Sequence, residues 1–167
     1  MKLDVQVVED EVALSGPGSG RDLAAEEWNR LRWRDPAAIA VAEPERTMTV
    51  AELMGAARAR AGQLQTHGVT PGARVIVARP NVIEFVVDYL AVRLCGAVLV
   101  NLPWSAGSSI TELAQVLDAR AVILEEALVG DNPLFAQLGA RRFDDTIKGV
   151  DGPDAPVPRA PDELAWL

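Results

Sequence analysis

The chain carries one histidine, His67, and one cysteine, Cys95, two residue types that often serve as nucleophiles, bases or metal ligands. No serine or cysteine pattern typical of a catalytic partner accompanies His67. A structural zinc site needs four nitrogen or sulfur ligands, which one Cys and one His cannot supply, and one cysteine forms no intramolecular disulfide. The sequence therefore predicts no metal site. We interpret His67 as a residue of a helix end and Cys95 as a core residue.

A glycine-rich stretch at residues 16–20, Gly-Pro-Gly-Ser-Gly, is a candidate for phosphate binding by composition alone. A phosphate-binding loop follows an apolar strand and ends in Gly-Lys-Ser or Gly-Lys-Thr, and this stretch has neither feature. We interpret it as a flexible connector. Alternating residues before it, such as Val5 and Val7, indicate a short hairpin. Residues 1–20 are therefore predicted to form a hairpin and a connector.

The loop that begins with Trp104 and Ser105 is the candidate for a ligand-binding cleft. It follows an apolar run at 97–100 that indicates a buried strand, and open α/β sheets bind ligands beyond the carboxyl ends of their strands. The serines and the glycine at 105–109 offer hydroxyls and amides that suit a pantetheine arm, an acyl group or a phosphate. The alternative interpretation is that Trp104 is a packing anchor, because tryptophan covers a large apolar area.

The elements that would position these residues alternate along the chain. Short apolar runs predict parallel strands at 38–42, 74–78, 97–100 and 120–124, and helical spacing predicts helices at 21–34, 50–66, 81–95 and 109–118. Pairs three residues apart mark three helix starts, because a cap side chain and a glutamate can satisfy each other's free amides. These pairs are Thr49 with Glu52, Asn81 with Glu84, and Ser109 with Glu112.

This alternation predicts an α/β fold, namely an open, mainly parallel sheet with helices on both faces, over residues 21–147. Four prolines change the composition after Lys148, so residues 148–167 are expected to form a proline-rich linker and a truncated strand. The predicted helix at 82–94 is apolar on most faces, and the chain ends in Trp166-Leu167. Surface of this kind favours association with further polypeptide or with a second copy as a homodimer.

The charge and the cysteine content exclude several classes of partner. The net charge is −8, and a negative field repels both nucleic acid and acidic membrane surfaces. No apolar stretch reaches the length of a membrane span, and the start has no basic segment typical of a signal peptide. A single cysteine fits a reducing compartment, so the expected location is the cytoplasm.

Five short motifs, in order, resemble the amino-terminal region of the adenylate-forming superfamily, the acyl- and aryl-CoA synthetases and their relatives. They are Thr49-Val50-Ala51-Glu52-Leu53, Gly68-Val69-Thr70-Pro71-Gly72-Ala73-Arg74-Val75, Pro80-Asn81-Val82-Ile83-Glu84-Phe85, Tyr89-Leu90-Ala91 and Gly96-Ala97-Val98. Two departures are Ala73, where the family usually has aspartate, and Asn101-Leu102-Pro103-Trp104, where it often has Pro-Leu-Asn-Pro. The resemblance covers residues 21–167. The matching residues also have a purely structural explanation as caps and turns.

The resemblance implies an acid:CoA ligase that uses ATP, Mg²⁺ and CoA. Such an enzyme activates a carboxylic acid as acyl-AMP and passes the acyl group to the thiol of CoA. In the family, the phosphate loop and the catalytic lysine follow a segment like 161–167, so this chain is expected to contain no catalytic residue, to bind no cofactor itself and to be inactive alone. The alternatives are an adenylation domain that loads a carrier protein and a non-catalytic α/β binding module.

Overall fold

A three-stranded parallel sheet is the centre of the molecule. The computed structural model describes residues 22–80, 82–107, 109–125, 138–143 and 151–158. The strands are β3 (Arg74–Ala78), β4 (Val98–Asn101) and β5 (Ala121–Leu124), in the order β4-β3-β5, and both pairs are parallel. The predicted parallel α/β sheet is therefore confirmed for these three strands.

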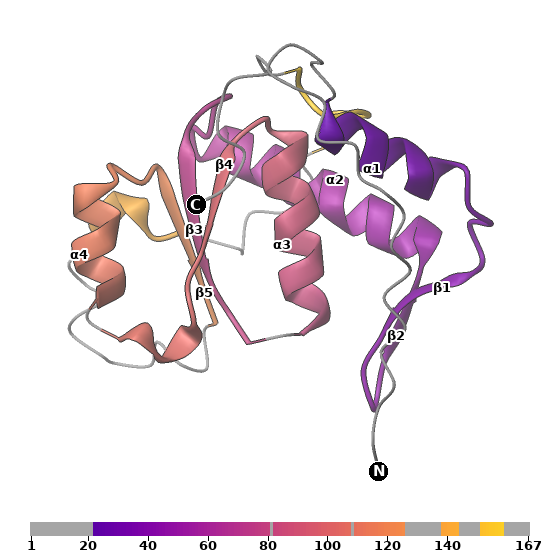
Figure 1. Cartoon of the computed structure of the whole chain (residues 1–167), viewed down its shortest axis with the longest axis horizontal. Helices are drawn as coiled ribbons and strands as arrows, with labels where there is room; N and C mark the ends of the chain where they lie inside the picture. The colour runs from indigo at the N-terminus through magenta and orange to yellow at the C-terminus, as the bar shows by residue number, and fades with distance from the viewer. Residues whose placement is uncertain (1–21, 81, 108, 126–137, 144–150, 159–167) are drawn as a thin grey trace, which may run out of the picture.

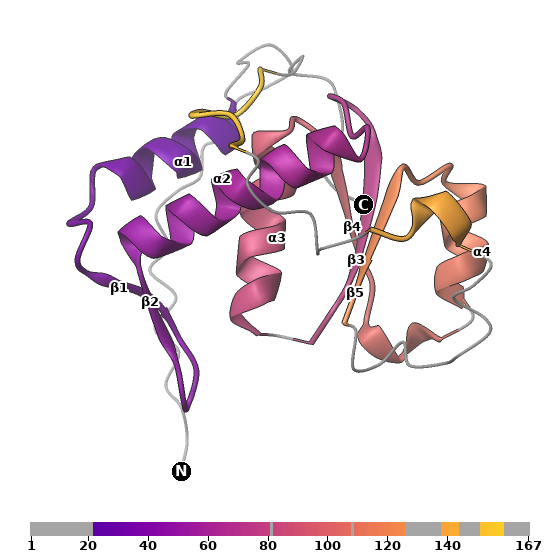
Figure 2. The ribbon, with the colours of Figure 1, turned by 180° about the vertical axis from the view of Figure 1, so that it is seen from behind.

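Helices cover both faces of this sheet (Figures 1 and 2). One face carries α2 (Val50–Thr66) and α3 (Ile83–Leu94), with α1 (Leu23–Arg32) outside them, and the other face carries α4 (Ser109–Val116) and the short helix η2 (Gly139–Arg141). Alternate residues of each strand point to opposite faces, so Val75 and Val77 join the larger apolar core under α2 and α3, while Ile76 joins the smaller one under α4. The strands are buried on both sides, as their continuous apolar runs predict.

The strand predicted at 38–42 does not belong to this sheet, so that part of the prediction is wrong. Strand β1 (Ile39–Ala42) pairs antiparallel with β2 (Thr47–Thr49) in a separate two-stranded sheet. Its residues are exposed or half-buried, and 62% of the Ile39 surface is accessible. A tight turn, closed by the Glu43 amide donating to the Arg46 carbonyl, supplies a partner strand only a few residues away. This local pairing forms in place of a long-range parallel one.

The helix starts agree with the capping prediction at α2 and differ from it at α3. The Glu52 amide donates to Thr49 Oγ1 at 3.3 Å, and the Thr49 amide donates to the Glu52 carboxylate at 2.8 Å, which is the predicted reciprocal cap. Helix α3 begins after Val82, whose side chain makes no cap hydrogen bond. The Ile83 amide donates instead to Glu43 in the β1–β2 turn, so a distant segment caps this helix. The proposed cap Asn81 lies outside the described residues.

The described part of the proline-rich segment, residues 151–158, lies against the helices. Trp28 donates from Nε1 to the Asp154 carbonyl at 2.9 Å, and the Val157 amide donates to the Leu94 carbonyl at 3.0 Å. A Cβ at Gly152 would stand 2.0 Å from the carbonyl oxygen of Arg58, so only glycine fits there. This segment therefore joins α1, α2 and α3. Residues 1–20 and 159–167, with the predicted hairpin, connector and truncated strand, lie outside the described part of the chain.

Candidate functional site

The carboxyl ends of the three parallel strands meet at one edge of the sheet, at the bottom of Figure 1. The short helix η1 (Trp104–Ala106) follows β4 at this edge, so the backbone of Trp104 and Ser105 lies where the sequence places it. The Ser105 side chain is exposed. The structure therefore brings both residues to the edge where open α/β sheets bind ligands, while their role in a cleft stays a prediction.

A chain of ion pairs around the buried side chains of Arg79 and Asp88 lies near the same edge, and the sequence did not predict it. Arg79 follows β3, and its Nη1 lies 2.9 Å from Oε2 of Glu125, which follows β5. The Arg79 Nε lies 2.8 Å from Oδ2 of Asp88 on α3, a residue with no accessible surface. Arg60 on α2 approaches the other Asp88 oxygen at 3.4 Å. Four charged side chains thus connect two helices with the ends of two strands.

The chemistry of this buried network is positional. Both carboxylates are held by guanidinium groups, so neither is available as a base, and the charges of the four groups sum to zero. Burial removes each ion from water, so a pair of this kind adds little net stability, while loss of one partner leaves the other charge buried and unpaired. A sequence signal was present: Asp88 interrupts an otherwise apolar helix, and a buried carboxylate requires a cationic partner.

Cys95 and His67 occupy the structural positions that the sequence predicts. Cys95 is buried behind α3, and burial raises the pKa of its thiol to about 12, so the thiol stays protonated at neutral pH. Its Sγ lies 3.5 Å from the Ala61 carbonyl. His67 ends α2, and its ring packs edge-on against Phe143 with centroids 5.6 Å apart. Within the described residues, no cluster of three or more His, Cys, Asp or Glu side chains is placed to hold a metal ion.

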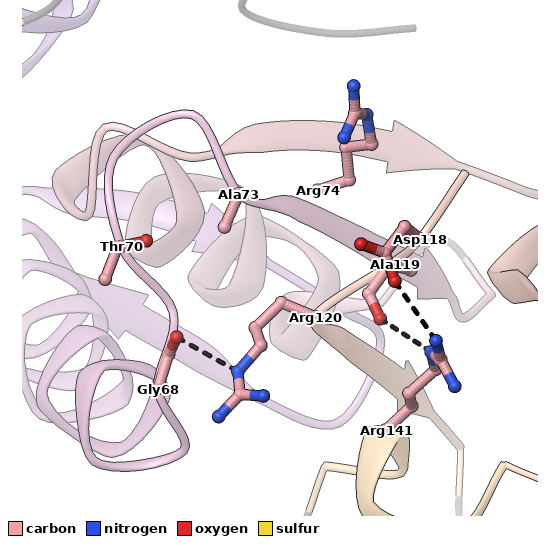
Figure 3. A pocket seen from close by; sticks show the side chains of 8 residues that line it. All are labelled: Gly68, Thr70, Ala73, Arg74, Asp118, Ala119, Arg120 and Arg141. Carbon is pink, nitrogen blue, oxygen red and sulfur yellow. Dashed lines mark hydrogen bonds and ion pairs between the residues drawn. The ribbon is translucent and has the colours of Figure 1, made fainter.

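A hollow of about 440 Å³ opens at the opposite edge of the sheet, where β3 and β5 begin (Figure 3). Arg74 at the start of β3, Arg120 before β5 and Arg141 in η2 line it, and in Figure 3 the Arg74 side chain points away from the other two. Its other lining residues are Gly68, Thr70, Ala73, Asp118 and Ala119. The Arg120 Nε donates to the Gly68 carbonyl at 3.1 Å, and the Arg141 Nε donates to the Ala119 carbonyl at 3.1 Å. We call this hollow and its three arginines the arginine pocket.

A smaller hollow of about 270 Å³ lies between α1, β1, α2 and α3. The hydroxyl of Tyr89 donates to Glu27 at 3.2 Å, and Arg93 lies over the Tyr89 ring. Burial raises the pKa of this tyrosine above its usual value, with a further contribution from the Glu27 charge. The phenol is therefore a hydrogen-bond donor at neutral pH rather than a base.

Comparison with models of known protein families identifies the family of this chain. The model of the AMP-binding enzyme family matches residues 27–164, most of the chain. The chain belongs to the AMP-binding enzyme family. The predicted resemblance is therefore confirmed. No curated protein sequence matches the chain.

Solved structures with the same fold include a CoA ligase, a CoA synthetase and the protein MatB. A benzoate CoA ligase from Burkholderia xenovorans aligns with a TM-score of 0.73 and 21% identity, over 86% of this chain and 32% of the ligase. MatB from Rhodopseudomonas palustris gives 0.68 and 23%, over 85% and 31%. The o-succinylbenzoate CoA synthetase from Bacillus subtilis gives 0.63 and 21%, over 77% and 34%. At these identities the likeness shows the fold alone, and the chain spans about a third of each structure.

The residues that carry the resemblance have structural roles in this member of the AMP-binding enzyme family. Gly68 and Gly72 have φ of +89° and +78° in the turn before β3, and Gly96 has φ of +64° after α3, a region that side chains disfavour. Thr49 and Glu52 form the reciprocal cap of α2. None of these five residues needs a ligand to explain its type. In the described part of the chain, no helix is long and apolar enough to cross a membrane.

Proposed function

We propose that this chain is the amino-terminal portion of an ATP-dependent acid:CoA ligase. Such an enzyme joins a carboxylic acid to ATP to give acyl-AMP and pyrophosphate, and then passes the acyl group to the thiol of CoA. The observation that carries the proposal is the family match over residues 27–164, which falls on a fold shared with a benzoate CoA ligase and an o-succinylbenzoate CoA synthetase. We expect Mg²⁺ to accompany ATP and the cytoplasm to be the location.

In this proposal the chain supplies scaffold rather than catalytic groups. Its buried network holds the carboxyl ends of β3 and β5 together through Arg79 and Glu125, next to the loop that starts at Trp104. The carboxylates of this network are already paired, and the thiol of Cys95 is buried and protonated. ATP, acid and CoA would therefore be bound mainly by further polypeptide, which is the partner that the scaffold requires.

Pyrophosphate exchange tests this function. The 167-residue chain and the longest polypeptide encoded by its gene are assayed for acid-dependent exchange of labelled pyrophosphate into ATP, with a panel of aromatic and aliphatic acids. We expect exchange and CoA thioester formation from the longer polypeptide only. Turnover by the 167-residue chain contradicts the scaffold role. Transfer to a phosphopantetheinyl carrier protein but not to CoA identifies a carrier-loading adenylation domain, and no exchange with any acid supports a non-catalytic module.

Trp104 and Ser105 are proposed to line the substrate or CoA cleft. In the active longer polypeptide, Trp104→Ala should raise the KM for acid or CoA severalfold while the Tm changes little. Ser105→Ala should act in the same direction with a smaller effect, because a hydroxyl contributes less contact area than an indole. The matched control is Trp33→Ala. Trp33 directly follows α1, distant in sequence from Trp104, and is 89% exposed. A large fall in Tm with unchanged KM leaves Trp104 only a packing role.

Association with a second copy stays an expectation for the 167-residue chain. The large apolar side chains that are exposed in the described residues are Leu23, Trp33, Ile39 and Val116. Light scattering measures the outcome directly. A dimer, or a complex with the rest of the ligase, supports the expectation, and a monomer at high concentration contradicts it.

A further inference from the structure

The arginine pocket lies where β3 and β5 begin (Figure 3), whereas Trp104 and Ser105 follow the carboxyl end of β4. Its three arginines come from three segments that are distant in sequence: the start of β3, the turn before β5, and η2. The Arg120 amide donates to the Arg74 carbonyl at 2.8 Å, which fixes the starts of the two strands side by side. The fold therefore gathers positive charge at one hollow.

Two of the three guanidinium groups are oriented by carbonyl oxygens. Arg120 donates to the Gly68 carbonyl and Arg141 donates to the Ala119 carbonyl, both from Nε. A carbonyl carries no net charge, so it orients a guanidinium without neutralising it. The one lining carboxylate is Asp118, which accepts from Arg141 Nη2 at 3.1 Å and is itself 85% exposed at its side chain. Three cations and one anion leave the pocket with a charge of +2.

This local charge is opposite in sign to that of the whole chain, which is −8. The ends of α2 and α4 lie at the same edge, and their dipoles favour nearby cations, which helps to hold the arginines there. Arg74 is exposed, and its guanidinium has no partner among the described residues. A concave site with oriented donors and excess positive charge concentrates anions from solution.

Gly68 allows Arg120 to lie across the floor of the pocket. A Cβ at this position would stand 2.2 Å from Arg120 Nη2 and 2.8 Å from Nε. The φ of +89° also disfavours a side chain. Glycine at position 68 therefore has two roles: it allows the positive φ of the turn, and it leaves room for the Arg120 guanidinium.

The lining indicates the chemistry of the ligand. The volume of about 440 Å³ lies in the range of small-molecule sites, and none of the eight lining residues is aromatic, so a base or an acyl ring has no stacking surface. Guanidinium groups pair with phosphate through two parallel hydrogen bonds, and three of them on separate segments offer more than one phosphate position. Thr70 adds an exposed hydroxyl. We propose that the arginine pocket binds a diphosphate group, either as free pyrophosphate or as part of a nucleotide.

Isothermal titration of the 167-residue chain at constant ionic strength tests this proposal with pyrophosphate, ADP, AMP and sulfate. Pyrophosphate and ADP should bind with similar affinity, because only the diphosphate is recognised, and AMP and sulfate should bind about tenfold more weakly. Arg74→Gln should weaken pyrophosphate binding about tenfold, as expected for loss of one charge-assisted contact. The control Arg32→Gln changes the net charge equally on exposed α1 and should alter the affinity less than about twofold.

Several outcomes overturn the proposal. Equal losses in Arg74→Gln and Arg32→Gln mean that only the overall charge matters. Equal affinity for sulfate and pyrophosphate removes the diphosphate selectivity, and ADP much tighter than pyrophosphate places recognition at a base rather than in this pocket. Competition by a hexaglutamate peptide at the same concentration as pyrophosphate assigns the pocket to an acidic protein segment instead. Unchanged pyrophosphate affinity in Arg120→Gln, with an unchanged Tm, also contradicts the site.

Discussion

The two edges of the central sheet use the same residue types in opposite ways. At the carboxyl edge, the side chains of Arg79 and Asp88 are 5% and 0% exposed, and the pair is 2.8 Å apart. At the amino edge, the side chains of Arg141 and Asp118 are 40% and 85% exposed, at 3.1 Å. The distances between the charged atoms of the two ion pairs are therefore nearly equal. The two pairs differ in how far their side chains are buried.

Burial changes what an arginine can do. A buried guanidinium is fully committed to its carboxylates, because each unpaired ion in the interior would be strongly destabilising. An exposed guanidinium exchanges its partner for water or for another anion at little cost. The carboxyl edge is therefore a fixed frame, and the amino edge keeps donors available. The two edges should respond differently to loss of one charge, to backbone strain and to salt.

The largest expected effect is at Asp88. Asp88→Asn removes the charge that Arg79 and Arg60 share in the interior, so it should lower the free energy of unfolding by about 3–5 kcal/mol. Urea unfolding followed by circular dichroism measures this change. Asp118→Asn is the matched control, because it makes the same chemical change in the exposed pair of the other edge and should stay within about 1 kcal/mol of the parent. Equal effects of the two substitutions would erase the distinction between the edges.

The strands and helices of the fold were only partly predictable from the sequence. The three strands and α2 follow from continuous apolar runs and one reciprocal cap, because these signals are local. Strand β1 was assigned to the wrong sheet, since its true partner β2 is a three-residue strand with no clear alternation. The cap of α3 comes from Glu43, 40 residues earlier, and no local pattern reveals such a contact. Local signals thus predict elements better than they predict their partners.

The sites show the same limit. The position of Trp104 beyond β4 follows from strand order and was correct for the backbone. Asp88 was visible as a charge inside an apolar helix, but its partners Arg79 and Arg60 lie on two other elements. The arginine pocket needs three distant segments and a glycine under a guanidinium, so composition gave no indication of it. Convergence of side chains from several elements is a property of the tertiary structure.

The intermediate effect is expected at Gly68, on the amino edge. Gly68→Ala forces a side chain into positive φ and displaces Arg120, and should destabilise the chain by about 1–2 kcal/mol. Gly72→Ala is the control, because its φ of +78° is similar but no atom lies within 4 Å of the added Cβ. The two variants should have similar unfolding midpoints, since the end of the Arg120 side chain can move, while only Gly68→Ala should weaken pyrophosphate binding. Equal losses of pyrophosphate affinity in the two variants would contradict a role for Arg120 in binding.

The smallest expected effect is at Arg141, and its dependence on salt concentration distinguishes this exposed ion pair from the buried one. Arg141→Gln breaks an exposed ion pair with Asp118 while the Ala119 contact can be partly replaced by the amide, so the loss of stability should be below about 1 kcal/mol. Because water and salt screen this pair, the remaining difference from the parent should shrink further in about 1 M NaCl, where the Debye length is near 3 Å. The effect of Asp88→Asn should persist in the same salt, since buried charges are screened far less. Urea titrations of the parent and both variants at low and high salt supply the comparison. A salt-sensitive loss at Asp88, or a salt-resistant loss at Arg141, would show that exposure does not distinguish the two edges.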